Sequence, residues 1–174
     1  MSDLSYPIGR FTPDPSPTPE TRARHIGEIA ALPARMRKAV AGLTEEQLST
    51  PYREGGWTLR QVVHHVPDSH VNAYIRCKLA LTEEIPTIKP YDQSAWANLQ
   101  DSALTPVDVS LSFLEAIHSR WVTLLRALKA EDFKRQFKHP ETGMQTIEST
   151  VALYAWHSNH HLAHITGLRE RRGW

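Results

Sequence analysis

The sequence has one cysteine, little net charge and no long apolar run. Cys77 stands alone, which excludes an intrachain disulfide framework and is typical of a reducing compartment. No stretch is apolar for the length of a membrane span, and the N-terminus lacks the charged-then-apolar layout of a signal peptide. The formal net charge is only +1, so there is no electrostatic reason to expect nucleic acid as a partner. These absences predict a cytoplasmic protein that binds neither nucleic acid nor a membrane.

Strong strand patterns and internal repeats are missing as well. Apolar residues recur instead at spacings of three and four, the period of an amphipathic helix, in four long stretches. We expect these helices over residues 18–42, 58–83, 105–128 and 146–171. Four amphipathic helices predict an all-α fold, a four-helix bundle, and a chain of 174 residues suits one domain over residues 1–174.

Residues 1–18 lie outside this helical pattern. They cannot be helical, because prolines at positions 13, 15, 17 and 19 interrupt the stretch. We expect an extended, proline-rich arm. Its apolar residues Tyr6, Ile8 and Phe11 should cover a surface, either on the body of the same chain or on a neighbouring subunit. A surface on a neighbouring subunit would make the protein a homodimer, which is the state we expect.

Two prolines lie inside predicted helices, where each removes a backbone hydrogen bond. Pro33 should bend the first helix, and Pro67 should kink the second. The connection over residues 84–105 is long, with one short helix expected near 93–99. Unstructured connections of this length are uncommon and often serve as lids or binding loops.

Histidine is the residue that the chain has in unusual number. Of 10 histidines, seven fall in two segments, one in the second predicted helix and one in the fourth. These seven are His64, His65, His70, His157, His160, His161 and His164. The remaining three, His25, His118 and His139, are scattered and are expected to be structural or surface residues.

The fourth helix carries two histidine pairs at the spacing i,i+4, which stacks the rings on one face. Two imidazoles placed in this way can hold one divalent cation. The helical phase puts His161 inside the apolar stripe and His157 at its shoulder, whereas His164 lies further round and His160 near the edge that faces water. The phase therefore favours His157 and His161 as the ligand pair. The alternative is a helix with surface histidines and one satisfied core histidine, and the density of four histidines in eight residues, with a second cluster elsewhere, favours metal binding over it.

A catalytic metal site usually has at least three protein ligands, and the third should come from the second helix. The apolar stripe of that helix points His70 most nearly inward, with His65 well to one side. Pro67 makes the phase between these two residues unreliable. Periodicity therefore leaves both residues open and modestly favours His70.

Two segments of the sequence resemble a known family. Residues 55–65 read Gly-Gly-Trp-Thr-Leu-Arg-Gln-Val-Val-His-His, and residues 156–165 read Trp-His-Ser-Asn-His-His-Leu-Ala-His-Ile. Both are similar to the DinB-like metal-binding four-helix bundles, and most of all to the subgroup of metal-dependent hydrolases related to the bacillithiol transferases. The resemblance implies His65, His157 and His161 as ligands of one divalent metal per chain, zinc or nickel. It also implies a homodimer.

A cation held by three neutral histidines keeps its full charge, so it can lower the pKa of water to about 7 or deprotonate a thiol. The chain lacks the His-Glu-x-x-His motif and therefore the general base of the zinc peptidases. His164 and His160 are candidate bases, with a structural or surface role open for each. Asp68, one turn past His65, is a candidate partner for a ligand imidazole, although a solvated acid on the helix surface is the favoured alternative.

Two classes of function follow from this chemistry. The first is an enzyme that acts on a small molecule, either by metal-assisted hydrolysis or by transfer of a low-molecular-weight thiol to an electrophile. The second is a metal-holding binding or stress-response protein without turnover.

Overall fold

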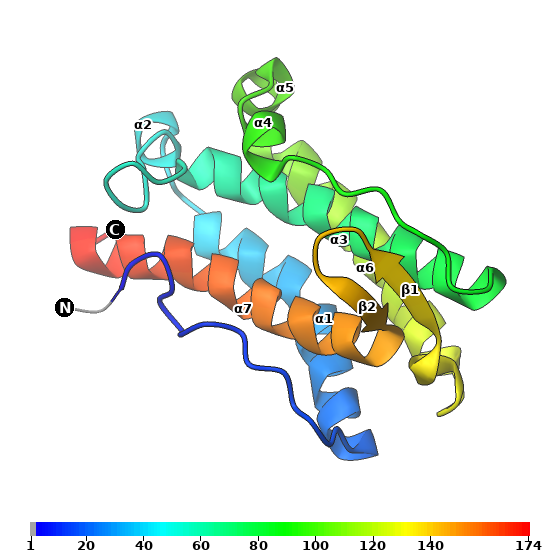
Figure 1. Ribbon diagram of the computed structural model, residues 1–174. Coiled ribbons are helices and arrows are strands. Elements are labelled where there is room, and N and C mark those ends of the chain that lie inside the picture. Colours follow the sequence, from blue (N-terminus) through cyan, green and yellow to red (C-terminus); the bar gives the residue numbers. More distant parts are fainter. Residues whose placement is uncertain (1–2) are drawn as a thin grey trace.

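A computed structural model describes residues 3–174 of the chain (Figure 1). Its four long helices are α1 (Pro19–Val40), α3 (Leu59–Thr82), α6 (Val107–Ala127) and α7 (Ile147–Arg172). The most extensive helix contacts are α1 with α7, α3 with α6, α1 with α6, and α3 with α7, so α1 lies diagonally across from α3. The prediction of an all-α four-helix bundle is confirmed.

Threonine N-caps start most of the helices, as the sequence suggests. In α1, α3, α7 and the short helix α2 (Glu45–Leu48), a threonine hydroxyl accepts a hydrogen bond from the backbone N–H three residues later. The side chain at that third position bonds back to the N-cap backbone, which completes a capping box. Helix α6 differs, because its N-cap is Pro106 and no side chain caps it.

Pro33 and Pro67 lie inside α1 and α3, and both helices continue past them. Each proline lacks the N–H that would bond to the carbonyl four residues earlier. The expected bends stay predictions.

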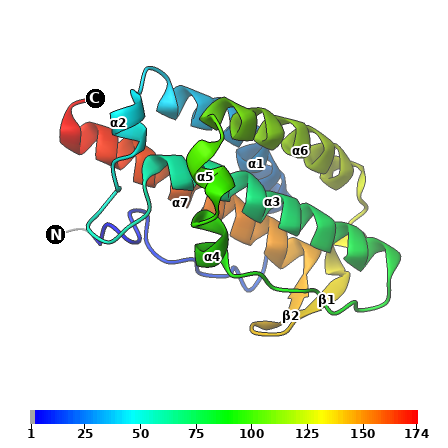
Figure 2. The same cartoon turned by 90° about the horizontal axis from the view of Figure 1, so that it is seen from above.

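The connection between α3 and α6 contains two short helices instead of the one expected. These are α4 (Gln93–Ala97), which Asp92 caps, and α5 (Gln100–Leu104). Both contact α3, and Figure 2 shows them crossing over its first half. The break between them follows from Asn98 and Leu99, whose backbones leave the helical conformation.

The structure also contains two short strands, for which the sequence has no strong pattern. After a short 3-10 helix, η1 (Asp132–Lys134), an antiparallel hairpin forms from β1 (Gln136–His139) and β2 (Gly143–Thr146). Only Phe137 is fully buried in these two four-residue strands, so the sequence has almost no alternation to reveal them. The hairpin is also held from outside, because the N–H of Ile88 donates to the carbonyl of Lys138.

The N-terminal arm lies along α7 of its own chain (Figure 1). The indole N–H of Trp156 donates to the carbonyl of Gly9 at 3.2 Å, and Phe11 packs against the same indole. Of the two surfaces open to the arm, the structure thus favours the body of the same chain. The homodimer stays a prediction. Within residues 3–174, no helix combines the length and the apolar character that crossing a bilayer requires.

Candidate metal centre

Three histidines from two facing helices meet near the middle of the bundle. His65 comes from α3, and His157 and His161 come from α7; one ring nitrogen of each lies within 4.8 Å of the others. The Nε2 atoms of His65 and His157 are 3.4 Å apart. Three imidazole donors at this separation, with no carboxylate among them, suit a borderline transition metal such as zinc or nickel. The donor set therefore fits the metal that the resemblance implies.

His70, which periodicity favoured, is not a member of this group. It is completely buried, as its phase suggested. Its Nε2 lies 3.1 Å from Nδ1 of His157, and its Nδ1 lies 2.9 Å from Nε2 of His118 on α6. Helical phase correctly gave the depth of His70 but could not show which histidine of α3 lies close to both His157 and His161.

The three grouped histidines are held in the form that binds metals. Burial, with the nearby His160 as a second cause, lowers the pKa of His65 to about 4. Burial is also the main reason that the pKa values of His157 and His161 lie well below the usual value, with the neighbouring histidines as a second cause. The rings are therefore neutral at neutral pH, each with one nitrogen lone pair available.

A second histidine group lies on α7 alone and consists of His160, His161 and His164, whose ring nitrogens also come within 4.8 Å of one another. The expectation that His160 faces water is wrong, because the ring stacks on Trp156 and the arm residue Tyr6 covers it. His164 is buried as well and stacks on Tyr52 with ring centroids 3.9 Å apart. The covering residues Tyr6 and Tyr52 are remote from α7 in sequence, so the phase of one helix could not reveal them.

The second group differs from the first in its hydrogen bonds. Within the part of the chain that the structure describes, Nδ1 of His160 and Nε2 of His164 are buried without a hydrogen-bond partner. Burial lowers the pKa of each ring to about 4, and the positive charges of Arg53 and Arg171 oppose protonation of His164 further.

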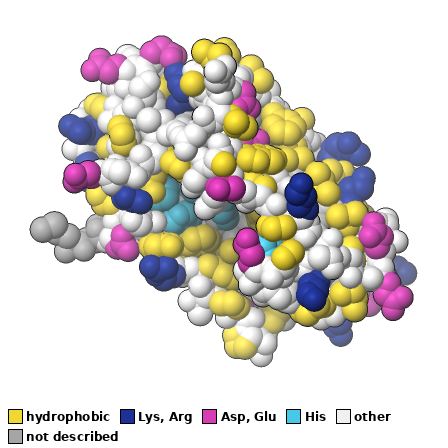
Figure 3. Space-filling view, turned by 45° about the horizontal axis from the view of Figure 1, so that its top comes forward, with side chains coloured by type: hydrophobic (Ala, Val, Ile, Leu, Met, Phe, Trp, Pro, Cys, Tyr) yellow, Lys and Arg dark blue, Asp and Glu magenta, His cyan; other side chains and the backbone are white. Residues whose placement is uncertain are grey.

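His157 and His161 of the first group and all three histidines of the second group line one cavity of about 480 Å³. Its walls are largely aromatic and include Tyr6, Tyr52, Trp57 and Trp156, and one cation, Arg53, belongs to the lining. Among the described residues, no aspartate or glutamate lines the cavity. Figure 3 shows histidine side chains at the bottom of a hollow on this face of the molecule. The site is thus open to a small molecule on one side.

The structure decides two alternatives that the sequence left open. Asp68 has no hydrogen bond to His65; it is half-buried, and burial together with the nearby Asp101 raises its pKa to about 6. Of the structural and surface roles open to His118, the structure shows the structural one, because His118 is buried with Nδ1 2.6 Å from the carbonyl oxygen of Ile29. Its spacings of four from Leu114 and three from Trp121 place it in the apolar stripe of α6 and could have shown this.

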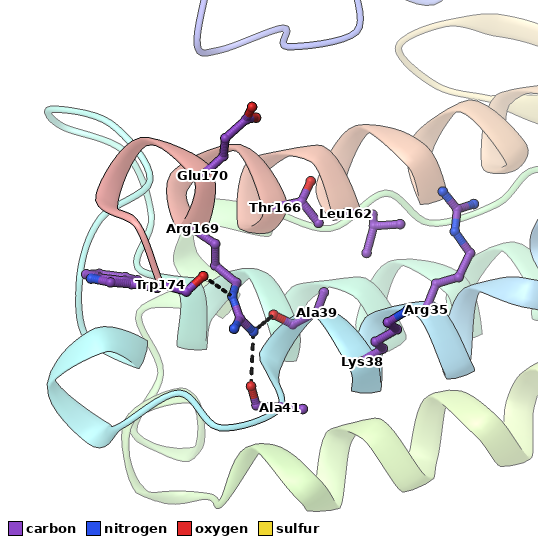
Figure 4. A pocket seen from close by; sticks show the side chains of 9 residues that line it. All are labelled: Arg35, Lys38, Ala39, Ala41, Leu162, Thr166, Arg169, Glu170 and Trp174. Atoms are coloured by element: carbon purple, nitrogen blue, oxygen red, sulfur yellow. Dashed lines mark hydrogen bonds between the residues drawn. The ribbon is translucent and has the colours of Figure 1, made fainter.

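A larger cavity, of about 660 Å³, lies between the ends of α1 and α7 (Figure 4). No histidine is among the residues that line it. One of its two arginines, Arg169, donates to the carbonyls of Ala39, Ala41 and Trp174, so that side chain joins the helix ends. We therefore assign the chemistry to the smaller, histidine-lined cavity.

The chain is similar to known proteins over its whole length. The family model described as "DinB superfamily" matches residues 28–165. Two proteins named "Putative metal-dependent hydrolase", from Bacillus cereus and Bacillus anthracis, are 57% and 56% identical over 100% of both chains. The solved structure of YfiT from Bacillus subtilis, described as "a probable metal-dependent hydrolase with an unusual four-helix bundle topology", has a TM-score of 0.95 at 51% identity and covers 98% of each chain. A further four-helix bundle, TT2238, shares the fold at 19% identity and a TM-score of 0.59, over 84% of this chain and 99% of that one.

Proposed function

Because this chain belongs to the DinB superfamily, we propose that it is a metal-dependent enzyme that holds one divalent metal, zinc or nickel, through His65, His157 and His161. The observation that carries the proposal is the convergence of these three rings from two facing helices beside an open cavity. A metal bound there supplies a Lewis acid that lowers the pKa of water or of a thiol.

The chain's own residues bind and orient the substrate. The cavity has the size of a small-molecule site, and its aromatic walls exclude water from the reacting groups. With Arg53 in the lining and without an acidic side chain there among the described residues, it favours neutral or anionic substrates over cationic ones. We therefore propose a small substrate with an apolar part and, where it is charged, a carboxylate near Arg53.

His160 and His164 are the candidate bases, and their surroundings make them weak ones. An imidazole whose protonated form has a pKa of about 4 is a poor acceptor for a proton of water at neutral pH. A thiol needs less help, because it loses its proton more readily than water does. In thiol transfer the sulfur forms a bond to the electrophilic carbon, the leaving group departs with the bonding electrons, and the thiol proton goes to solvent. We therefore favour thiol transfer over simple hydrolysis.

Two other proposals follow from the sequence. A metal-holding protein without turnover is the alternative, and it shares the same ligands.

We also propose that the chain forms a homodimer through the exposed apolar residues around α5 and α6, of which Leu104 is 78% exposed. Replacing Leu104 by Lys should weaken association in sedimentation, whereas Met144→Lys, on the hairpin, should not; a wild-type monomer at micromolar concentration would contradict the dimer.

Activity of the metal-loaded protein tests the choice between these functions. The protein is incubated with a low-molecular-weight thiol and an activated electrophile, and separately with an activated ester, each against a chelator-treated control. We expect metal-dependent loss of the thiol with formation of the conjugate. Ester turnover that is indifferent to thiol would identify a hydrolase, and the absence of metal-dependent turnover of both kinds would favour the binding protein.

A further inference from the structure

Three buried histidine rings form a chain that ends on the candidate metal centre. The chain runs from the carbonyl oxygen of Ile29 to Nδ1 of His118 (2.6 Å), from Nε2 of His118 to Nδ1 of His70 (2.9 Å), and from Nε2 of His70 to Nδ1 of His157 (3.1 Å). It crosses from α1 through α6 and α3 to α7. Both ring nitrogens of His118, His70 and His157 have a polar neighbour; for Nε2 of His157 this neighbour is Nε2 of His65.

The direction of every hydrogen bond follows from the first one. The carbonyl of Ile29 can only accept, so Nδ1 of His118 must carry the hydrogen. A neutral imidazole has one N–H, so Nε2 of His118 accepts from Nδ1 of His70. By the same rule Nε2 of His70 accepts from Nδ1 of His157. The remaining nitrogen, Nε2 of His157, is left with a free lone pair.

The rule of one N–H per ring applies because the rings are buried and uncharged. His70 is 0% and His118 is 2% exposed to solvent. No carboxylate of the described residues forms a hydrogen bond with any of the three rings, and a buried imidazolium without such a partner is costly.

The sequence explains why the Ile29 carbonyl, at the start of the row of histidine rings, is free to accept. Ile29 stands four residues before Pro33 in α1, and its carbonyl would normally accept from the backbone N–H at position 33. Proline has no N–H, so this carbonyl lacks its helical donor. The imidazole of His118 supplies the donor from the neighbouring helix.

We propose that His118, anchored on the Ile29 carbonyl that Pro33 leaves free, is a positioning residue that sets the tautomer of His157 through His70, so that Nε2 of His157 is ready to bind the metal. The metal-binding part of this inference rests on the proposed function, whereas the ring tautomers are a property of the metal-free protein. Loss of the acceptor at position 118 allows His70 to carry its hydrogen on Nε2 and to donate to Nδ1 of His157. His157 then carries its own hydrogen on Nε2, the nitrogen that should bind the metal. Changes in the hydrogen-bond partners of metal ligands weaken metal binding by roughly 10- to 100-fold.

The test compares His118→Leu, which removes the acceptor, with His118→Gln, whose carbonyl oxygen can still accept from His70. His139→Leu, at the half-exposed end of the hairpin, is the control for the loss of a histidine. Two readouts are measured on the full chain. Long-range proton–nitrogen correlation spectra of nitrogen-labelled histidine give the ring tautomers after chelation, and competition with a chromophoric chelator gives the Kd for Zn²⁺.

We expect wild type, His118→Gln and His139→Leu to show the hydrogen of His157 on Nδ1 and to bind Zn²⁺ similarly. His118→Leu should show a mixture of His157 tautomers and bind Zn²⁺ roughly 10- to 100-fold more weakly. An unchanged His157 tautomer in His118→Leu would overturn the proposal, as would the opposite tautomer in the wild-type spectrum, which needs no variant to fold. Wild-type protein that shows the expected tautomers but binds no Zn²⁺ would refute the proposed function and leave the tautomer relay supported.

Discussion

The two histidine groups share His161 but differ in what lies behind each ring. In the group of His65, His157 and His161, the ligands come from two helices, and His157 is held from behind through His70 and His118. In the group of His160, His161 and His164, all rings come from α7; His160 stacks on Trp156, and His164 stacks on Tyr52. Ring stacking fixes the plane of an imidazole but not which nitrogen carries the hydrogen. The comparison thus suggests that hydrogen bonds behind the rings, more than histidine density, distinguish a ligand group from a cavity wall.

The largest expected effect is the loss of metal from the first group only. The double change His157→Ala and His161→Ala should reduce metal content from about one ion per chain to almost none, because one remaining imidazole cannot retain the ion. The matched double change His160→Ala and His164→Ala should leave the content near one. Elemental analysis of the purified proteins measures both. Equal loss in the two variants would remove the distinction between the groups.

A smaller but still large difference is expected between His65→Ala and His70→Ala. The first removes a proposed ligand, and the second removes only the partner of His157. Zn²⁺ affinity should therefore fall more in His65→Ala, and in His70→Ala it should fall by about 10- to 100-fold. Chelator competition gives both values. If His70→Ala alone lost the metal, the choice that periodicity favoured would be correct.

Acid should destabilise the metal-free chain through the buried histidines behind the first group. Burial lowers the pKa of His118 to about 4, although its bond to Ile29 acts in the opposite direction. Unfolded histidine has a pKa of about 6.5, so the unfolded state binds more protons as the pH falls from about 6.5 toward 4. The contribution of His118 to the free energy of unfolding is therefore fully present above about pH 6.5 and is lost on acidification. For this one ring the loss is on the order of 3 kcal/mol.

Urea unfolding of the metal-free protein at about pH 7 and about pH 4.5 measures this loss. His118→Gln cannot titrate at position 118 and should lose less stability between the two conditions than wild type. An equal loss in both proteins would show that the pH dependence arises elsewhere, for example in His70 or in the second group.

Substrate preference should change when the cation of the cavity is removed. Arg53→Gln should raise KM for an anionic electrophile by about tenfold, the value of one charge-assisted contact of about 1.4 kcal/mol. It should leave KM for a neutral analogue unchanged. For the anionic electrophile, the KM of Arg53→Lys should lie between those of the wild type and Arg53→Gln. Steady-state kinetics with paired anionic and neutral substrates measures the effect, and an equal change for both substrates would exclude charge recognition.

The smallest expected effect concerns Pro33. In Pro33→Ala a backbone N–H returns to position 33 and shares the Ile29 carbonyl with His118, but a carbonyl has two lone pairs and can accept both bonds. Zn²⁺ affinity should therefore fall by only a few-fold, while the helix itself gains a better helix former. A loss as large as that of His118→Leu would mean that Pro33 acts through the shape of α1 and not through the carbonyl.

The long helices could be predicted from sequence because their signals are local. Thr18, Thr58 and Thr146 cap their helices through residues only three positions away, and the apolar stripes repeat within one element. The hairpin was missed because its pairing depends on contacts with the segment around Ile88, far away in sequence, and on a single buried side chain, Phe137.

The same distinction explains what could be predicted about the site. His157 and His161 follow from one helix and its phase. The choice between His65 and His70 depends on which ring comes close to both His157 and His161 across the bundle, which periodicity cannot determine, and the resemblance to a family supplied His65. His160 was misplaced because Tyr6 covers it. The choice between a structural and a surface role for His118 stayed open because its partner is the carbonyl of Ile29, a group that every residue has.

The location of a bound metal tests the central claim most directly. Crystals of the full chain grown with zinc give the position of the ion from anomalous diffraction above the zinc absorption edge. We predict one ion per chain, at about 2.0–2.1 Å from a ring nitrogen of each of His65, His157 and His161, with Nε2 as the donor of His157. An ion bound instead to His160 or His164, or to Nδ1 of His157, would contradict the account.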